Sequence, residues 1–593
     1  MRQTESSGAP TRAGWRTRED WKWALAAVGL FGLLFAVLRV ALPVPVEEPY
    51  LVRVSLVQDM LLAGLFTALL WRAGRFVLEL RHLLPLPADP REREALLLVR
   101  DRAGSFALLF ALFATPLLLW FLGEYPGHLF TDQLQSLYIS SLHRVDPWLS
   151  SFWGLYAGAI DRVSGDRFTT LVVLNILLLS WVLADSFSLM LRYGLSRRVA
   201  VPFVVLLMTS IPVGLLSINL SHDILAGFLK LAVQAVLLRV FVRGALRGGQ
   251  PGTSVGTLAL LGVLVLCSAF LRGENLALYA YIPAVLLLTR QARWRAVAVW
   301  GVCIVTGNLL FRQAVEPAVL HPLQLQSDLK ERYTLTLLLN PLSFMVTNDY
   351  YSATPEEDRR IISELVQWDC VVQRSTPYEL PCYWGSVVTP VTKEKIAALR
   401  RVYVLAALNN PGLYLASRSS TFFATLGLNP SPMYPFIPGR ESVPDATLYG
   451  QHTELVATRG LLFERDNPGV LSRLTHRLRD WSFPHRGVQS PGYFIWNGLP
   501  ALLLLLGLLA TLRSHPVSAA IAGVSGSTLA LFFIATPASH LTYLADLWVF
   551  GYLAVPLLVF ERTGLRRLRL GGREDMTPAV PRSERPGAGP EGR

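Results

Sequence analysis

The sequence predicts an all-α polytopic membrane protein with about 12 transmembrane helices and a mixed extracytoplasmic domain. Of the 593 residues, 52% are hydrophobic and only 16% are charged, whereas soluble proteins carry about 25% charged residues. The hydrophobic residues form blocks of roughly 20, the length that spans a bilayer as a helix. Because lipid cannot hydrogen-bond to the backbone, such blocks have to be helical. A soluble fold is therefore excluded.

The basic residues fall in alternate loops. They precede the first hydrophobic block and follow the second, fourth, sixth, eighth and last, whereas the short loops 43–50 and 537–540 contain no Lys or Arg. This positive-inside pattern predicts a multi-pass protein of the inner or plasma membrane with both termini in the cytoplasm. The pattern also accounts for the net charge of +13, so the charge does not indicate binding to nucleic acid. The expected partner is the lipid bilayer.

The expected helices follow from the hydrophobic blocks. They span residues 22–42, 51–71, 104–123, 168–190, 199–219, 223–243, 254–271, 275–290, 294–313, 494–512, 516–536 and 540–560. The apolar stretch 148–160 is too short to cross the membrane as the other blocks do. Counting it as a crossing would place every later loop on the opposite side of the membrane. We therefore interpret it as an interfacial or re-entrant helix.

These helices divide the chain into five parts. They are a cytoplasmic N-terminal tail (1–21), a transmembrane region (22–313) with an outer loop at 124–167, an extracytoplasmic domain (314–493), C-terminal transmembrane helices (494–560) and a disordered cytoplasmic tail (561–593). The segment 314–493 is too long for a connector. Within it, Thr354 and Pro355 have the residue types of a helix start, and 393–408 has apolar residues at helical spacing.

Four cysteines divide by location. Cys267 and Cys303 lie in apolar helices and are expected to be packing residues. Cys370 and Cys382 lie close together in the extracytoplasmic segment, where a disulfide between them is expected, with two unpaired thiols as the alternative.

The segment 124–135 begins the first sizeable outer loop, with the sequence Glu-Tyr-Pro-Gly-His-Leu-Phe-Thr-Asp-Gln-Leu-Gln. A Tyr-Pro-Gly turn followed by Asp and Gln resembles the catalytic loop of the GT-C superfamily of polytopic, lipid-phosphate-sugar-dependent glycosyltransferases. The resemblance is closest to bacterial membrane families of unknown function. It implies that Asp132 is the general base or orients the acceptor, supported by Tyr125 and Gln135.

Three further segments fit the same superfamily. Asp223 stands where its members often have a second acidic residue, although many have Lys where this chain has His222. The resemblance implies that Arg272 meets the donor phosphate, with Glu274 beside it. His540 opens the last helix, where relatives often carry Arg-Tyr, so this chain departs from the pattern and His540 is expected to replace the arginine.

The chemistry of the expected reaction requires carboxylates and cations together at the membrane surface. A polyprenyl-phosphate sugar places its phosphate at the membrane surface, where a cation must neutralise it. The acceptor hydroxyl needs a base near the anomeric carbon. The expected function is therefore transfer of a sugar to an extracytoplasmic glycan, lipid or protein acceptor. No cofactor is required by this chemistry, and the sequence leaves open whether the carboxylates bind Mg²⁺ or Mn²⁺.

Other interpretations stay open at this point. Asp132 and Asp223 could each cap a helix, Arg272 and Glu274 could pair with one another, and His128 and His222 fit surface loop residues better than metal ligands. A transporter or flippase of lipid-linked glycans would show related halves or broken helices, and the sequence shows neither. A non-catalytic scaffold would tolerate neutralisation of Asp132. A polymerase or ligase of finished glycans would share the lipid-phosphate chemistry.

Overall fold

The computed structural model describes eleven parts of the chain. They are residues 90–125, 127–128, 150–164, 169–320, 329–373, 386–388, 390–426, 469–482, 495–536, 540–565 and 568. These parts are helical, with two isolated β-bridges and no strand. The mixed composition expected of the extracytoplasmic domain is therefore not found in its described residues. The helices expected at 22–42 and 51–71 and most of the tail 561–593 lie outside the described residues.

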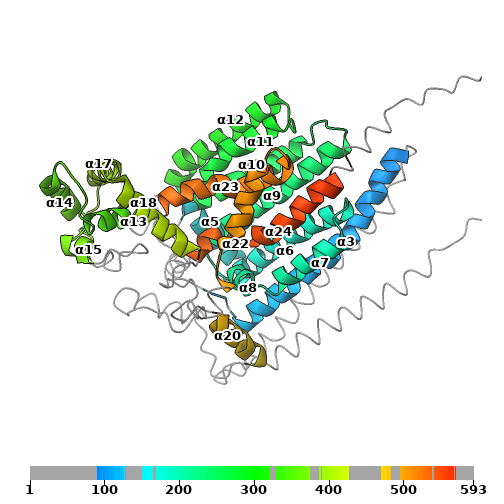
Figure 1. The fold of residues 1–593 in the computed structure, drawn as a ribbon, viewed down its shortest axis with the longest axis horizontal. Coiled ribbons are helices and arrows are strands. Elements are labelled where there is room, and N and C mark those ends of the chain that lie inside the picture. The colour runs from blue at the N-terminus through cyan, green and yellow to red at the C-terminus, as the bar shows by residue number, and fades with distance from the viewer. Residues whose placement is uncertain are drawn as a thin grey trace, which may run out of the picture.

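The helices of the transmembrane region occur in chain order (Figure 1). Their bounds are α3 (Pro90–Gly123), α5 (Ser151–Ser164), α6 (Thr169–Arg192), α7 (Arg197–Met208), α8 (Ile211–Ser217), α9 (His222–Leu246), α10 (Val255–Leu271), η1 (Gly273–Ala277), α11 (Leu278–Leu288), α12 (Trp294–Leu310), η2 (Phe311–Leu320), α22 (Leu499–Ala510), α23 (Pro516–Ala535), η4 (Leu541–Leu544), α24 (Ala545–Phe560) and η5 (Glu561–Leu565).

Six described helical segments are long and apolar enough to cross a membrane. They are Ser105–Gly123, Thr169–Arg192, His222–Leu246, Trp294–Ala318, Pro516–Ala535 and Leu541–Leu565. Each matches an expected span within a few residues, which supports a membrane protein. The apolar helices α10 and α22 are shorter than the spans expected at 254–271 and 494–512, and η1 and α11 together cover the span expected at 275–290. The total of 12 crossings stays a prediction.

The span expected at 199–219 is broken. Its two halves, α7 and α8, meet at an angle of 60°. Ser210 has extended backbone geometry, with φ −70° and ψ 110°, and Pro212 lies in the first turn of α8, where its missing N–H is tolerated. Ser210 caps the new helix by accepting a hydrogen bond from the Val213 amide at 3.4 Å.

Helix α9 forms the centre of the bundle. It packs against α6, α10, α23 and α24, and 89% of its most apolar window is buried. Gly227 permits the close approach to α24, because a Cβ there would lie 3.1 Å from the Ala545 Cβ. Since neighbouring helices surround α9, its polar side chains can find protein partners instead of facing lipid.

A second helical unit lies to one side of the bundle (Figure 1). It comprises α13 (Leu329–Val346), α14 (Pro355–Ser363), α15 (Trp368–Gln373) and α17 (Lys393–Asn409), which share an apolar core of their own. Helix α18 (Pro411–Thr425) contacts α13 and α17 on one side and α23 and η4 on the other, so it joins the unit to the bundle. Helix α20 (Val470–Ser482) packs separately, against α3.

The sequence located two helices of this unit correctly. Helix α14 begins at Pro355 and α17 covers the segment expected at 393–408. Thr354 makes no capping hydrogen bond to the backbone, unlike the expected N-cap. Cys370 is disulfide-bonded and Cys267 is a free thiol; Cys382 lies outside the described residues, so the expected pairing stays a prediction.

Candidate functional site

Three segments converge at the end of the bundle where α9 begins, α10 ends and η4 leads into α24. We call the side chains gathered there the Asp223 cluster. It consists of Ser221, His222, Asp223, Arg272, Glu274, Thr542 and Tyr543. The cluster brings together four expected site residues, His222 and Asp223 from one segment and Arg272 and Glu274 from another. The positive-inside pattern predicts that this end faces the outside, and this orientation stays a prediction.

Local sequence fixes Asp223 in the first turn of α9. Ser221 is the N-cap residue, and its hydroxyl oxygen accepts a hydrogen bond from the Asp223 amide at 3.1 Å. The same hydroxyl donates to Asp223 Oδ2 at 2.9 Å. A carboxylate in the first turn is also favoured by the positive end of the helix dipole. The expected capping is thus carried out by Ser221, which leaves Asp223 to contact other segments.

Arg272 is directed toward the cluster by a break in the helix. After α10 ends at Leu271, Arg272 has extended backbone geometry, with φ −141° and ψ 126°. The side-chain amide of Asn275 stabilises this break, because its Nδ2 donates to the Ser268 carbonyl at 3.1 Å and to the Ser268 hydroxyl at 2.9 Å. The guanidinium lies 4.2 Å from the centre of the Tyr543 ring, a cation–π contact.

The guanidinium of Arg272 is shared between two carboxylates. Its Nη1 donates to Asp223 Oδ1, and its Nε donates to Glu274 Oε1 at 2.6 Å. The expected pairing of Arg272 with Glu274 is therefore present, together with a second pairing to Asp223. Two acids and one base leave one surplus negative charge when the histidines are neutral.

The two acids differ in their surroundings. Asp223 is also contacted by His222 Nε2 at 3.1 Å and by the Thr542 hydroxyl at 3.4 Å, and its side chain is only 5% exposed. An acid held by so many donors is a weak base. The Glu274 side chain is 15% exposed and reaches a hollow in the bundle. Glu274 is therefore the more accessible of the two carboxylates.

His540 precedes η4 and lies against Tyr543, with 5.2 Å between the ring centroids. Burial and the nearby Arg272 lower the pKa of His540 to about 4, although the Asp223 carboxylate acts in the opposite direction. The imidazole is thus neutral at pH 7. It can form a hydrogen bond with a phosphate but supplies no positive charge, which differs from the arginine it was expected to replace.

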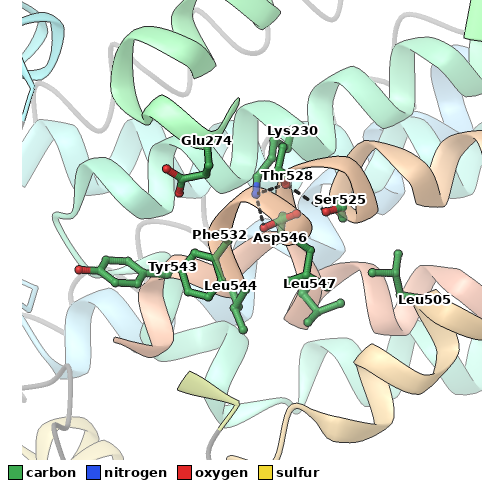
Figure 2. A pocket seen from close by; sticks show the side chains of 11 residues that line it. Lys230, Glu274, Leu505, Ser525, Thr528, Phe532, Tyr543, Leu544, Asp546 and Leu547 are labelled. Atoms are coloured by element: carbon green, nitrogen blue, oxygen red, sulfur yellow. Dashed lines mark hydrogen bonds and ion pairs between the residues drawn. The ribbon is translucent and has the colours of Figure 1, made fainter. Parts of the chain in front are cut away.

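A narrow hollow of about 10 Å³, roughly the space of one water molecule, lies between the cluster and the interior of the bundle (Figure 2). Glu274 and Tyr543 lie at one side of it, and Lys230 of α9 points toward Asp546 of α24. Their Nζ and Oδ1 atoms are 2.7 Å apart, and Lys230 also donates to the Thr528 hydroxyl at 3.4 Å. The sequence analysis did not single out Asp546.

The beginning of the outer loop lies beside the segment that leads to Asp223. The His128 amide donates to the Ile218 carbonyl at 3.0 Å, and the Leu220 amide donates to the His128 carbonyl at 3.0 Å. Gly127, with φ +115°, permits this approach, since a Cβ would lie 2.7 Å from the Ile218 oxygen. The Tyr125 ring contacts Phe121 edge-on.

Glu124 ties this loop to α20. Its Oε2 accepts hydrogen bonds from Arg479 Nη1 at 2.8 Å and His128 Nε2 at 3.1 Å, and it lies 3.4 Å from His476 Nε2. Burial opposes ionisation of Glu124, but these histidines and Arg479 together hold its pKa well below the usual range. The expectation of surface histidines was wrong for His128 and His222, because both are buried in contact with carboxylates.

Asp132 and Gln135 lie outside the described residues, so their expected roles stay predictions. Within the described ranges, no group of three or more His, Cys, Asp or Glu side chains has an arrangement that could hold a metal ion. No protein-family model, curated protein or solved structure matches the chain.

Proposed function

We propose that the protein is a membrane glycosyltransferase of the GT-C type, which moves a sugar from a polyprenyl-phosphate donor to an extracytoplasmic glycan, lipid or protein acceptor. The observation that supports this most strongly is the Asp223 cluster, in which Asp223 at the start of α9 meets Arg272 and Glu274 of the α10–η1 junction beside a narrow hollow. Ionisable side chains gathered at one end of a membrane bundle are typical of a functional site.

In the proposed reaction the acceptor hydroxyl oxygen attacks the anomeric carbon of the donor sugar. The bond between that carbon and the phosphate oxygen breaks, and polyprenyl phosphate leaves with the electron pair. A carboxylate takes the hydroxyl proton. Asp132 is the expected base, and Glu274 is the alternative among the described residues. Asp223 is a positioning residue in this scheme, because it acts by orienting Arg272.

Two features favour a transporter of lipid-linked glycans as the second candidate. The broken span formed by α7 and α8 is typical of transporters, in which discontinuous helices surround the substrate. The Lys230–Asp546 ion pair lies between two candidate spans and lines the same hollow as Glu274 and Tyr543. Ionisable residues inside the membrane often mark an ion or substrate pathway.

Sugar transfer in membranes that express the protein tests the proposal. Wild type, Asp132→Asn and the control Asp349→Asn, an acid of the second unit, are each supplied with a panel of radiolabelled polyprenyl-phosphate sugars. We expect wild type and the control to transfer one of them and Asp132→Asn to lose about 100-fold or more of that rate. Transfer that survives in Asp132→Asn would assign the base to Glu274.

A separate measurement distinguishes the second candidate. Vesicles containing the purified protein are loaded with a fluorescent lipid-linked sugar, and its movement between leaflets is followed together with transfer. Movement between leaflets without transfer from any donor would contradict the proposed enzyme and favour the transporter. A non-catalytic scaffold would show neither sugar transfer nor movement of the lipid between leaflets, and Asp132→Asn would change neither result.

A further inference from the structure

Helix α18 buries an unusual polar face between the second helical unit and the bundle. Ser417, Thr421 and Thr425 follow one another at intervals of four residues, and all three are buried, as is Arg418 beside them. Residues four apart lie on the same face of a helix. A helix that only joined two apolar cores would be expected to bury apolar side chains here.

Arg418 is the exceptional residue on this face, because its side chain has no exposed surface. Its Nη1 donates to the carbonyl oxygens of Ile534 at 3.2 Å and Thr536 at 2.7 Å, where α23 ends. Its Nε and Nη2 have no hydrogen-bond partner, and no carboxylate of the described residues pairs with it. Burial lowers the pKa of Arg418, since no carboxylate compensates for the loss of water. A buried charge without a counter-charge is strongly unfavourable.

The two unpartnered nitrogens form one edge of the guanidinium. Nε and Nη2 point in the same direction and can donate two parallel hydrogen bonds to a pair of anionic oxygens. Arg239 uses this same edge in the bundle, where its Nε and Nη2 both donate to the carboxylate of Asp185. At Arg418 both nitrogens of this edge are buried without a hydrogen-bond partner, so this edge is the part of the guanidinium that can still bind an anion.

The position of Arg418 favours a phosphate group. Helix α23 is a candidate span, so its last residues lie at the boundary between lipid and water, where lipid phosphates lie. One turn along α18, Phe422 packs on Phe532 with ring centroids 6.2 Å apart, and Phe532 packs on Tyr543 of the Asp223 cluster at 5.7 Å. Arg418 thus adjoins the candidate site without belonging to its charge cluster.

We propose that Arg418 binds a phosphate group through Nε and Nη2 at the end of α23. The ligand is the phosphate of a lipid headgroup or a free phosphate, which offer the same oxygens. Capping of α23 by Nη1 is a separate role that leaves the opposite edge of the guanidinium available. The inference does not require that sugar transfer takes place.

Binding to the purified full-length protein tests this inference. The protein is kept in a maltoside detergent, which contains no phosphate, and is titrated with farnesyl phosphate, inorganic phosphate and farnesol. Arg418→Gln retains an amide that can donate to the α23 carbonyls but removes the charge. Arg401→Gln removes an exposed arginine of the second unit and is the matched control.

We expect wild type and Arg401→Gln to bind farnesyl phosphate alike, and Arg418→Gln to bind it about 10-fold or more weakly. Tighter binding of farnesyl phosphate than of inorganic phosphate identifies a lipid headgroup, and equal binding identifies free phosphate. Farnesol binding should be the same in all variants.

Two results would overturn the inference. One is equal affinity of wild type and Arg418→Gln for both phosphates, and the other is the failure of wild type to bind either of them. If Arg418→Gln does not fold, Arg418→Lys decides, because it keeps the charge but lacks the two-nitrogen edge. Its affinity for the bound phosphate should fall by about 3- to 10-fold, and unchanged affinity would contradict the proposed geometry.

Discussion

Two arginine–carboxylate contacts on α9 differ in their balance of charge. Asp185 and Arg239 form a closed pair: Arg239 Nε donates to Asp185 Oδ2 at 2.6 Å, Nη2 donates to Oδ1, and the Trp181 ring covers the guanidinium at 5.4 Å. About 24 Å along the helix, Asp223 belongs to a cluster in which Arg272 serves two acids. The Asp185–Arg239 contact pairs one carboxylate with one guanidinium. The Asp223 cluster has two carboxylates for one guanidinium and so one negative charge in surplus.

The difference indicates which contact is structural. A buried pair that satisfies both of its members can hold two helices together and offers no group for chemistry. A cluster with surplus charge is less stable than a neutral arrangement, so its presence at helix ends beside a hollow favours a role in function. Each of the following predictions tests this contrast, in order of decreasing effect.

Arg272→Met should have the largest effect on stability. It leaves Asp223 and Glu274 as neighbouring carboxylates without their shared cation, and we expect the free energy of unfolding to fall by about 3–5 kcal/mol. Glu274→Gln in the same variant should recover about 1 kcal/mol or more, because it removes the surplus charge. Unfolding in a denaturing detergent measures both values. A loss below about 1 kcal/mol in Arg272→Met would show that the cluster is not held by Arg272.

The Asp185 pair should respond differently. Arg239→Met alone leaves a buried carboxylate and should lower the free energy of unfolding by about 3 kcal/mol. This value is at the low end of the range of about 3–5 kcal/mol for breaking a buried ion pair, because Arg239 is partly exposed. The double variant Asp185→Leu/Arg239→Met should lie within about 1 kcal/mol of wild type, since apolar side chains can replace an isolated pair. Loss of activity in a stable double variant would contradict a purely structural role.

His540 should make stability depend on pH. Its pKa of about 4 lies below the value of about 6.5 expected in the unfolded chain. Between these values the unfolded chain binds a proton that the folded protein excludes, so the free energy of unfolding falls as the pH falls from 6.5 to 4.

Because the His540 side chain keeps some contact with solvent, we expect a loss of about 1–2 kcal/mol over this interval. The neighbouring Asp223, Arg272 and His222 also influence the titration. Stability measured from pH 4 to 8 should therefore be flatter in His540→Gln than in wild type. Identical pH profiles would show that His540 does not carry the dependence.

Glu561 should have the smallest effect. Its carboxylate accepts hydrogen bonds from the amides of Val517 at 3.0 Å and Ser518 at 2.7 Å and so caps α23 from a neighbouring segment. Glu561→Gln has a single acceptor oxygen and should cost about 1 kcal/mol. Glu364→Gln, which weakens an exposed ion pair with Arg360, is the control and should cost less than about 0.5 kcal/mol. Equal losses of stability in Glu561→Gln and Glu364→Gln would show that Glu561 does not stabilise α23 by capping it.

Much of the helical arrangement could be predicted from the sequence, because a long apolar block in lipid has to be a helix. Counting the crossings also placed Asp223, Arg272 and His540 at one end of the bundle. The structure confirms their proximity but assigns them different states: Arg272 is neutralised by carboxylates and His540 is uncharged at pH 7. Proximity follows from topology, whereas charge state depends on tertiary contacts.

Other features could not be predicted because their partners are remote in sequence. Lys230 and Asp546 are more than 300 positions apart, and Arg418 contacts the end of α23 at residues 116 and 118 positions away. The break between α7 and α8 did leave a signal in Ser210 and Pro212 that the sequence analysis did not use. His128 was wrongly expected at the surface, because nothing in the local sequence shows that α20 packs against its loop.

The most direct test of the central claim compares the two acids of α9 and α6 in the same transfer assay. Asp223→Asn and Asp185→Asn are reconstituted at equal amounts of folded protein with the polyprenyl-phosphate sugar that wild type uses. We predict that Asp223→Asn loses about 100-fold or more of the transfer rate and Asp185→Asn loses less than about 3-fold. Equal rates in the two variants, or a larger loss in Asp185→Asn, would contradict the assignment of the Asp223 cluster as the functional site.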